Sequence, residues 1–423
     1  MRTIGIISEY NPFHSGHRYQ LEEIRKVFGA DCAIVCAMSG NWVQRGDAGI
    51  ADKWSRTKMA LCGGADLVLD LPTLWAASSA ETFARGGVSL LDATGLVDTL
   101  CFGSEDGQLE PLEKAAEALQ TADWQEALRG YLAKGLSFPA ARQKAAEALL
   151  GDAAACLRHP NNNLGIEYLR AMKDLDSYMM PYTILRVGAA HDDQQDASGE
   201  HVSASYLREQ ILHGDNSPLT PYLTPEDALE LRADPASLAF CTKGVLARLR
   251  SMEEADFDAL PDSGEGLGRK LCLAVQEADT LEQVYSLTKS KRYTHARIRR
   301  MVLWAFLGLT EADRPAAPPY LRVLGFSSRG QQLLKQMKTT ASLPVIVKPA
   351  HAAKLEPEAR RVFDLEARCT RMYDLCRTAF GKEPGKNEYT QNPVRIYQPA
   401  AKPPPCQTGR RFSYRIKGIR TGP

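Results

Sequence analysis

Two histidines three residues apart are the main chemical feature near the N-terminus of this 423-residue chain. They belong to the run Asn11-Pro12-Phe13-His14-Ser15-Gly16-His17, which follows an apolar stretch typical of a strand at residues 4–8. Helical spacing over residues 16–28 places both imidazoles on one face of a helix start. Backbone N–H groups there bind anions, and a glycine lets a ligand come close. Two imidazoles over a phosphate can donate hydrogen bonds to charge that develops in a pentacovalent transition state.

Two other interpretations of this pair remain open at the level of the residues. His14 and His17 could bind a metal ion, but the sequence has no third ligand at a recognisable spacing. They could also be incidental polar residues at a helix start. The full context of strand, Asn-Pro-Phe-His-x-Gly-His and helix favours a phosphate site, and we assign no metal-binding residue.

The first hundred residues supply the elements that must position this motif. Short apolar runs at 4–8, 32–38, 65–71 and 99–102 predict strands, and the helical spacing between them predicts helices at 16–28, 53–62 and 79–91. Alternating strands and helices predict a parallel sheet with right-handed crossovers. Such a sheet binds ligands at the carboxyl ends of its strands. We therefore expect an α/β protein with a Rossmann-like nucleotide-binding domain.

Turn signals and composition divide the rest of the chain. Residues 108–175 are rich in Ala, Leu, Glu and Lys and predict helices, residues 182–186 predict a strand, and residues 203–212 predict a helix. Prolines near 218 and 315 mark boundaries on either side of a helical pattern. The expected parts are an α/β domain that carries the histidine motif (1–215), a mainly helical region (216–315), a small C-terminal α/β module (316–383) and an extended basic tail (384–423).

Composition and charge indicate the cellular compartment but do not identify a binding partner. The net charge of +1 argues neither for nor against nucleic acid, although eight Lys/Arg against one Glu from Lys386 onward could contact phosphates or stay solvated. Ten cysteines form no CxxC pair, which argues against a zinc ribbon and for free thiols in a reducing compartment. Neither a signal peptide nor a membrane-length apolar run is visible. We expect a cytoplasmic protein with no membrane partner.

The histidine motif resembles the HxGH signature of the nucleotidyltransferase superfamily, which includes class I aminoacyl-tRNA synthetases and pantetheine-phosphate adenylyltransferases. In that superfamily the histidines contact ATP phosphates, and a second element is a Ser/Thr-rich helix start that ends in a basic residue. The run Ser203-Ala204-Ser205-Tyr206-Leu207-Arg208 looks like this element. The resemblance implies that Ser203 and Ser205 contact the β- and γ-phosphates and that Arg208 neutralises the leaving pyrophosphate. Taken alone, Ser203 would be an ordinary N-cap.

Longer motifs resemble the bacterial tRNA(Met) cytidine acetate ligase family. In chain order they are GIISEYNPFH at 5–14, QRGD at 44–47, DKWSR at 52–56, FGSE at 102–105, PNNNLG at 160–165 and KRYTHARIRR at 291–300. Several long motifs in one order make the resemblance specific over residues 1–310. Members of that family activate acetate with ATP as acetyl-adenylate and release pyrophosphate. They then transfer the acetyl group to N4 of the wobble cytidine of elongator tRNA(Met), giving N4-acetylcytidine.

The resemblance also implies a set of site residues. The ATP site would comprise Ile7, Ser8, Glu9, Tyr10, Asn11, Pro12, Phe13, His14, Ser15, Gly16, His17, Arg18, Tyr19 and Gln20, together with Gly103, Asn161, Asn162 and Arg186. A small residue at 103 would admit adenine or ribose. Without the resemblance, the asparagines would be a turn after Pro160 and Arg186 a surface salt bridge.

The implied reaction places acetate and the α-phosphate of ATP, both anionic, in contact. Mg²⁺, the two histidines and Arg208 would offset their repulsion, with Lys53 or Arg56 as further candidates. The cytidine amine would then attack the mixed anhydride directly, so no cysteine is needed.

A dense basic segment forms the expected nucleic-acid contact. Residues 289–300 contain six basic side chains and no acidic one. The expected contacts are Lys289, Lys291, Arg292, Arg297, Arg299 and Arg300 on the RNA backbone, with Tyr293 stacking on a base. The alternative is a solvated charged face, but the density favours RNA.

Two rival functions come from other classes. A small-molecule adenylyltransferase is usually a compact single domain, and the further 200 residues here argue against it. A non-catalytic RNA-binding protein could retain a nucleotide pocket, but the intact histidine pair argues against that. The sequence leaves open which acid is activated, what holds the acceptor cytidine, and the oligomeric state.

Overall fold

The computed structural model describes residues 1–136, 138–186, 202–214, 219–220 and 222–397. A central sheet runs through this part with the strand order β10-β8-β5-β2-β1-β6-β7, and β9 pairs with β8. Its five N-terminal strands are all parallel: β1 (Thr3–Ser8), β2 (Ala33–Ser39), β5 (Leu67–Leu71), β6 (Thr99–Ser104) and β7 (Met180–Leu185). The expected α/β class with a parallel sheet is confirmed.

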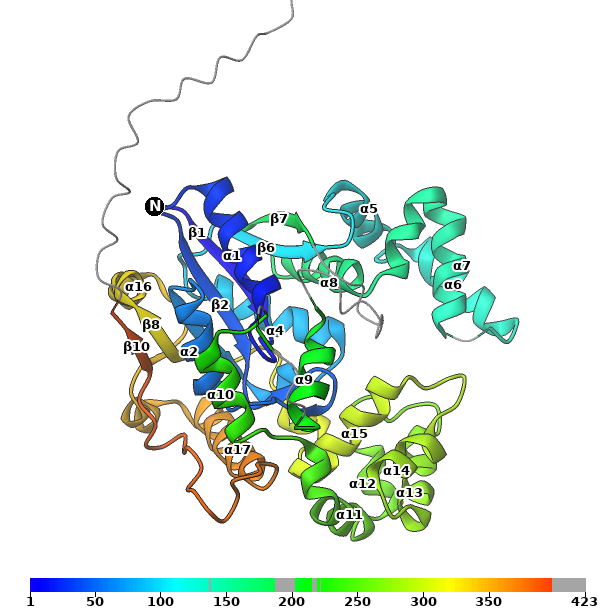
Figure 1. The fold of residues 1–423 in the computed structure, drawn as a ribbon. Helices are drawn as coiled ribbons and strands as arrows, with labels where there is room; N and C mark the ends of the chain where they lie inside the picture. The colour runs from blue at the N-terminus through cyan, green and yellow to red at the C-terminus, as the bar shows by residue number, and fades with distance from the viewer. Residues whose placement is uncertain (137, 187–201, 215–218, 221, 398–423) are drawn as a thin grey trace, which may run out of the picture.

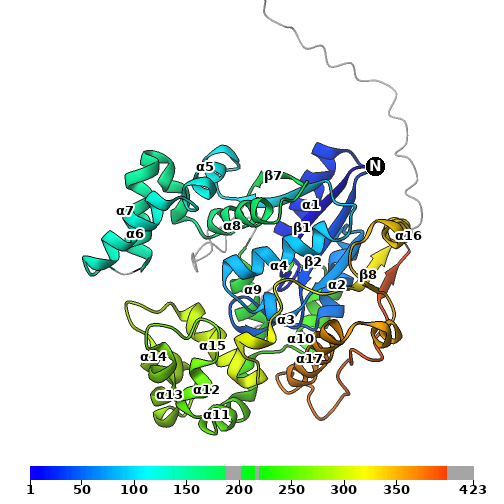
Figure 2. The same ribbon diagram turned by 180° about the vertical axis from the view of Figure 1, so that it is seen from behind.

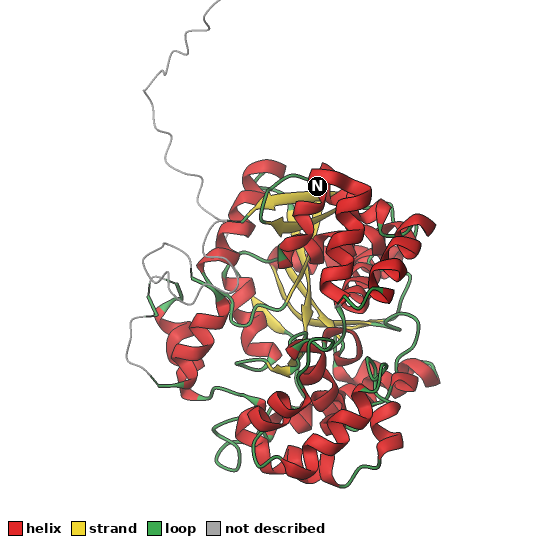
Figure 3. Ribbon diagram, turned by 90° about the vertical axis from the view of Figure 1, so that its right-hand side faces the viewer, coloured by secondary structure: helices red, strands yellow, loops and turns green. Residues whose placement is uncertain are grey.

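Strand β2 shows how the two faces of the sheet are built. All seven residues are buried, and alternate side chains enter opposite cores, as a period of two requires. Strands buried on both faces need continuous apolar runs, which is why the sequence revealed them clearly. Figure 3 shows helices on both sides of the strands. Helices α4 (Ala80–Asp92) and α8 (Pro160–Asp174) cover one core, and α1 (Ser15–Phe28) and α2 (Lys53–Cys62) cover the other.

Shorter elements and a helical arm surround this sheet. The hairpin of β3 (Trp42–Val43) and β4 (Asp47–Ala48) follows β2, and α3 (Thr73–Ala76) follows β5. The arm near β7 contains α5 (Glu110–Ala118), α6 (Ala122–Ala133), α7 (Phe138–Leu150) and the 3₁₀ segment η1 (Gly151–Arg158) (Figures 1 and 2). Helices α9 (Ala204–Leu212) and α10 (Pro225–Ala233) come next.

A separate group of helices gathers at one end of the molecule (Figure 1). It consists of η2 (Leu238–Cys241), α11 (Thr242–Arg250), α12 (Glu254–Asp258), α13 (Leu267–Glu277), α14 (Leu281–Thr288), α15 (His295–Leu307) and η3 (Glu311–Asp313). This arrangement agrees with the helical pattern in the sequence. Among the described helices, none is both long and apolar enough to cross a membrane.

The C-terminal segment is built onto the main sheet and not around a sheet of its own. It contains β8 (Leu321–Ser327), α16 (Ser328–Thr340), β9 (Val345–Ile346), η4 (Pro349–Lys354), α17 (Pro357–Asp374) and β10 (Val394–Ile396). Strand β8 is buried throughout and pairs antiparallel with β5. Gly325 permits this packing, because a Cβ there would lie 2.6 Å from the Thr57 methyl group. The expected tail also differs, since β10 pairs with β8; residues 398–423 lie outside the described residues.

Candidate active site

A pocket lies at the carboxyl ends of β1 and β6. From β1 the chain builds β2 and β5 on one side and then crosses to β6 on the other, so these neighbours form the topological switch point of the sheet. Open α/β sheets bind ligands at such a point. Most of the expected site residues line this pocket: Ile7, Ser8, Glu9, Tyr10, Asn11, His14, Gly16, His17, Tyr19, Gln20, Gly103, Asn161, Arg186, Ser203 and Arg208.

The first turn of α1 fixes the two histidines. His14 is the N-cap, and its Nδ1 accepts a hydrogen bond from the Gly16 N–H at 3.0 Å. The Nδ1 of His17 accepts from the His14 N–H at 3.3 Å, which completes a capping box made of imidazoles. The two ring centroids are 4.0 Å apart. Since each Nδ1 accepts a hydrogen bond, a neutral ring carries its proton on Nε2, where it can donate to a phosphate oxygen.

His17 is held in its neutral form. Burial, together with His14 and the positive charge of Arg186, lowers the pKa of His17 well below its usual range. Tyr10 and Phe13 pack against the ring at centroid distances of 4.9 and 5.7 Å, which accounts for much of that burial. A neutral Nε2–H donates a hydrogen bond without giving up its proton. His17 is therefore suited to stabilise developing charge and not to act as a general acid.

Helix α9 supplies the basic group on the pocket wall. Ser203 caps this helix by accepting from the Tyr206 N–H. Arg208 lines the pocket and donates from Nη1 to the Asn11 carbonyl at 2.7 Å, and from Nη2 to Ser205 Oγ at 3.1 Å. The guanidinium of Arg208 therefore joins α9 to the loop between β1 and α1, although almost 200 residues separate the two in the sequence. Ser205 itself does not line the pocket, so its observed contact is with Arg208.

The loops after β6 and before α8 are locked together by Glu105. Its carboxylate accepts from the backbone N–H groups of Asn161 and Asn162 at 3.1 and 2.8 Å, and from the Asn161 side chain at 2.7 Å. Asn162 is completely buried and accepts from the Glu105 N–H, so it positions the loop and does not reach the pocket. A Cβ at Gly103 would lie 2.9 Å from Cγ of Arg186, so the space beside this glycine holds the Arg186 side chain.

Other expected ATP residues lie off the lining. Phe13 is buried beneath α1, where a Cβ at Gly63 would lie 2.2 Å from its ring. Arg18 is exposed, and the Ser15 N–H donates to the Tyr222 carbonyl at 2.8 Å. Pro12 is buried in the loop. These residues shape the turn that presents the histidines.

The expectation that Lys53 or Arg56 offsets phosphate charge is wrong. Both are fully buried, and neither lines the pocket. Arg56 donates to four backbone carbonyls, including Glu9 at 2.6 Å and Ser39 at 3.2 Å, so it holds the ends of β1 and β2 in place. Its charge is directed at the protein backbone and not at a ligand.

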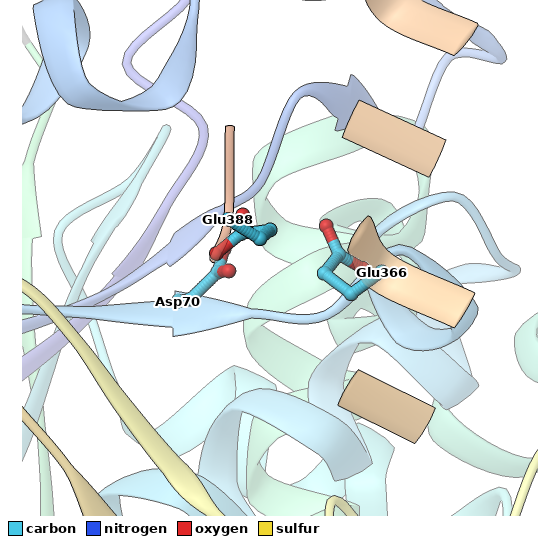
Figure 4. A group of neighbouring side chains, drawn as sticks. All are labelled: Asp70, Glu366 and Glu388. Carbon is cyan, nitrogen blue, oxygen red and sulfur yellow. The ribbon is translucent and has the colours of Figure 1, made fainter. Parts of the chain in front are cut away.

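Lys53 lies inside a group of buried carboxylates. Its Nζ contacts Asp70 at 2.5 Å, Glu366 at 3.4 Å and also Glu388. Figure 4 shows the three acids converging from β5, α17 and the segment before β10. Their oxygens are close enough to hold a metal ion. The Lys53 ammonium contacts all three and supplies the positive charge that they need, so this group joins the C-terminal segment to the sheet.

The basic segment at 289–300 is only partly available to RNA. Arg297 and Arg300 form ion pairs with Glu265 and Asp262 at 3.0 and 2.9 Å, and Lys289 donates to backbone carbonyls. Three of the expected contacts are exposed: Lys291, Arg292 and Arg299.

The stacking role expected of Tyr293 is wrong. Tyr293 is 6% exposed, and its hydroxyl donates to the Glu265 carbonyl at 2.5 Å. Its ring faces the helical core and is not open to a base.

Several lining residues were not expected. Gln44 and Arg45 come from the β3–β4 hairpin, and the aromatic wall comprises Phe83, Phe102 and Tyr168. The motif QRGD at 44–47 was a usable signal for the first two. No signal in the sequence marked Phe83 or Tyr168, because an aromatic residue in a helix is most often part of the core.

Comparisons with known proteins agree with this geometry. The model of the HIGH Nucleotidyl Transferase family matches residues 1–388. The tRNA(Met) cytidine acetate ligase of Acetivibrio thermocellus is 36% identical over 418 residues, covering 93% of this chain and 99% of the relative. That of Caldanaerobacter subterraneus is 39% identical over 387 residues, covering 89% and 95%.

Two solved structures of Thermotoga maritima TmcAL have the same fold. The apo form superposes with a TM-score of 0.87 at 29% identity, covering 94% of this chain and all of the other. A second structure, bound with alpha-thio ATP, gives a TM-score of 0.85 with the same coverage.

Proposed function

We propose that this chain, which belongs to the tRNA(Met) cytidine acetate ligase family within the HIGH nucleotidyl transferases, activates acetate with ATP and acetylates N4 of the wobble cytidine of elongator tRNA(Met). The observation that carries the proposal is the His14–His17 pair, fixed at the start of α1 and tied to Arg208 of α9 through the Asn11 carbonyl. The reaction belongs in the cytoplasm, where tRNA is found.

In the first step an acetate oxygen attacks the α-phosphorus of ATP. A P–O bond to acetate forms, the bond to the β-phosphate breaks, and pyrophosphate leaves. Negative charge grows on the oxygens of the pentacovalent phosphorus, and His14 and His17 donate to them from Nε2. Arg208 lines the pocket together with Arg45 and Arg186, and its guanidinium offsets the charge of the departing pyrophosphate. Ser203, the N-cap of α9, lies on the lining, so the N–H groups at the start of that helix would bind the same phosphates.

Magnesium is expected to accompany ATP. Glu9 is the one carboxylate on the lining among the described residues. A single carboxylate fits a magnesium ion that is held mainly by phosphate oxygens and water, and Glu9 would hold it on the protein side. When bound, the ion would offset phosphate charge as acetate approaches. The Gln44 N–H donates to Glu9 Oε1 at 2.7 Å and so orients this carboxylate.

In the second step the cytidine amine attacks the acetyl carbonyl and AMP leaves. The β3–β4 hairpin supports RNA as the acceptor. It carries Gln44 and Arg45 on the pocket lining, and a Cβ at Gly46 would lie 2.5 Å from the backbone of Arg299. The hairpin is therefore in direct contact with α15 at Arg299. Exposed Lys291, Arg292 and Arg299 then provide phosphate contacts beside the mouth.

Acetate-dependent exchange of labelled pyrophosphate into ATP tests the first step without tRNA. We expect the wild type to catalyse exchange and His14→Ala to lose about 10²- to 10³-fold of its exchange rate. His351→Ala should exchange at the wild-type rate, because His351 belongs to η4 and does not line the pocket. Acetylation of tRNA(Met) transcripts with labelled acetate tests the second step.

The two assays separate the rival functions. Exchange without tRNA acetylation would indicate a small-molecule adenylyltransferase. Absence of exchange with acetate, both with and without tRNA, would contradict the proposal and favour an RNA-binding protein that retains a nucleotide pocket.

A further inference from the structure

One wall of the active-site pocket has no role in the ATP contacts assigned above. Phe83 of α4, Phe102 of β6 and Tyr168 of α8 line the pocket and are 2%, 5% and 3% exposed. All three belong to the core that α4 and α8 form with one face of the sheet. This aromatic wall therefore offers a ligand two phenyl rings and one phenol.

The Tyr168 hydroxyl gives the aromatic wall a polar group that the protein leaves without a partner. Although Tyr168 is buried, its hydroxyl forms no hydrogen bond with another described residue. A buried hydroxyl without a partner costs free energy, so such a group on a pocket lining points to a ligand with an acceptor atom. Burial, together with the charge of Glu9, raises the pKa of Tyr168 and so keeps the phenol protonated as a donor.

The groups assigned to the triphosphate lie on the other face of the sheet. His14 and His17 begin α1 and Arg208 belongs to α9, and these two helices pack into the second core. When phosphorus is attacked in line, the incoming oxygen approaches from the side opposite the leaving group. Because Arg208 holds the leaving pyrophosphate in the proposed function, the attacking acid would approach from the side of the aromatic wall.

We propose that Phe83, Phe102 and Tyr168 form the acid subsite of this pocket and select a two-carbon carboxylate. The methyl group packs against the two phenyl rings, and one carboxylate oxygen accepts a hydrogen bond from the Tyr168 hydroxyl. The other oxygen attacks the α-phosphorus, a P–O bond forms, and pyrophosphate leaves with the electron pair of the broken P–O bond. The inference rests on the proposed function and adds to it the residues that choose the acid.

Close packing behind the aromatic wall limits the length of the acid. A Cβ at Gly165 would lie 2.6 Å from the Phe102 ring, and the Phe102 and Tyr168 ring centroids are 5.7 Å apart. Ile7 lines the pocket from β1 on the same face of the sheet, and a Cβ at Gly87 would lie 2.7 Å from its side chain. A close-packed interior admits an extra methylene only with strain. Acids longer than acetate should therefore be rejected.

The test is exchange of labelled pyrophosphate into ATP without tRNA, with acetate, propionate or butyrate as the acid. Phe83→Leu makes the wall smaller and keeps it apolar. The ratio of kcat/KM for propionate to kcat/KM for acetate should rise about tenfold or more above the wild-type ratio. Phe363→Leu is the matched control and should keep the wild-type ratio, because Phe363 is also buried, at 1% exposed, but belongs to α17 and does not line the pocket.

A second variant tests the hydrogen bond separately. Tyr168→Phe removes the hydroxyl and keeps the ring. Its KM for acetate should rise about tenfold, because a hydrogen bond to a charged oxygen is lost. Its KM for ATP should change much less, and a purely structural role of Tyr168 would not separate the two constants. Circular dichroism would verify that all three variants are folded.

The outcomes distinguish this inference from the proposed function. Absence of acetate-dependent exchange in the wild type would refute the proposed function and the acid subsite with it. If the wild type does exchange, an unchanged acid preference in Phe83→Leu or an unchanged KM for acetate in Tyr168→Phe would overturn the acid subsite alone. Wild-type exchange combined with lost tRNA acetylation in Phe83→Leu would also overturn it, because the wall would then bind the acceptor base.

Discussion

Replacing Lys53 by methionine should destabilise the protein, because it removes the ammonium from three buried carboxylates. The Lys53 side chain is 0% exposed, and its partners Asp70, Glu366 and Glu388 are 1%, 4% and 1% exposed. Among the described residues, the remaining ion pair of these acids is that of Arg322, whose Nε lies 3.6 Å from Glu388. Removing one partner of a buried ion pair costs about 3–5 kcal/mol, because the other charge stays buried without compensation.

The loss of stability in Lys53→Met should also depend on pH, and it should be larger at higher pH. Burial raises the pKa of Asp70 to about 7 even with Lys53 in place to oppose it. Without the ammonium, the folded-state pKa of Asp70 should lie still further above its unfolded value, and the pKa of Glu388, which Lys53 now lowers against burial, should rise. The folded variant then holds protons that the unfolded chain releases, so its stability falls as pH rises from about 4 through 7. The variant should therefore lag further behind the wild type at pH 8 than at pH 5.

The measurement is urea unfolding at these two pH values, followed by far-UV circular dichroism. A chain with several domains can unfold in more than one step, so the variants are compared by the midpoint of the first unfolding transition. Lys58→Met is the matched control on the same helix. Its side chain is 52% exposed and pairs with a partly exposed Glu230, so its loss should cost less than about 1 kcal/mol. The double variant Lys53→Met/Asp70→Asn should regain part of the loss. Equal stability of the Lys53 and Lys58 variants, or a deficit that does not grow with pH, would refute the argument.

Three further predictions concern the pocket and the basic surface. His17→Gln should lower kcat for pyrophosphate exchange by about 10²-fold or more. The shape of the pH–rate profile between pH 6 and 9 should not change, because the lowered pKa of His17 keeps this side chain neutral over that range. If the wild-type profile shows an ionisation in this range that is lost in the variant, the argument is wrong. Arg208→Lys should lower kcat/KM for ATP by about tenfold or more. A lysine ammonium cannot replace a planar guanidinium that donates to the Asn11 carbonyl and at the same time to the phosphates. Unchanged kinetics in the variant would show that Arg208 does not contact ATP in this way. Replacing exposed Lys291 and Arg292 by alanine should weaken tRNA binding and reduce its salt slope by about one per residue without affecting tRNA-free exchange, and an unchanged slope would place the RNA elsewhere.

The histidine motif illustrates what local sequence determines. The capping box joins His14, Gly16 and His17, all within one helical turn, so a strand, a turn and a helix start in succession specify it. The family resemblance drawn from the motifs is confirmed by relatives 36–39% identical over most of the chain. The strand and helix ranges of the first hundred residues were predicted to within a few residues, because strands buried on both faces are continuous apolar runs. The domain boundaries and the roles of the residues that line the pocket remain predictions.

The charged residues of the same motifs could not be interpreted locally. Lys53 and Arg56 belong to DKWSR, yet one contacts acids more than 300 residues away and the other binds backbone carbonyls. Tyr293 is likewise turned inward by a bond to Glu265. Sequence by itself determined the turn that carries the two histidines and the alternation of strands and helices, since both depend on neighbours in the chain. Only the tertiary structure decided which charges line the pocket and that β8 completes the N-terminal sheet, because burial and pairing depend on segments brought together by packing.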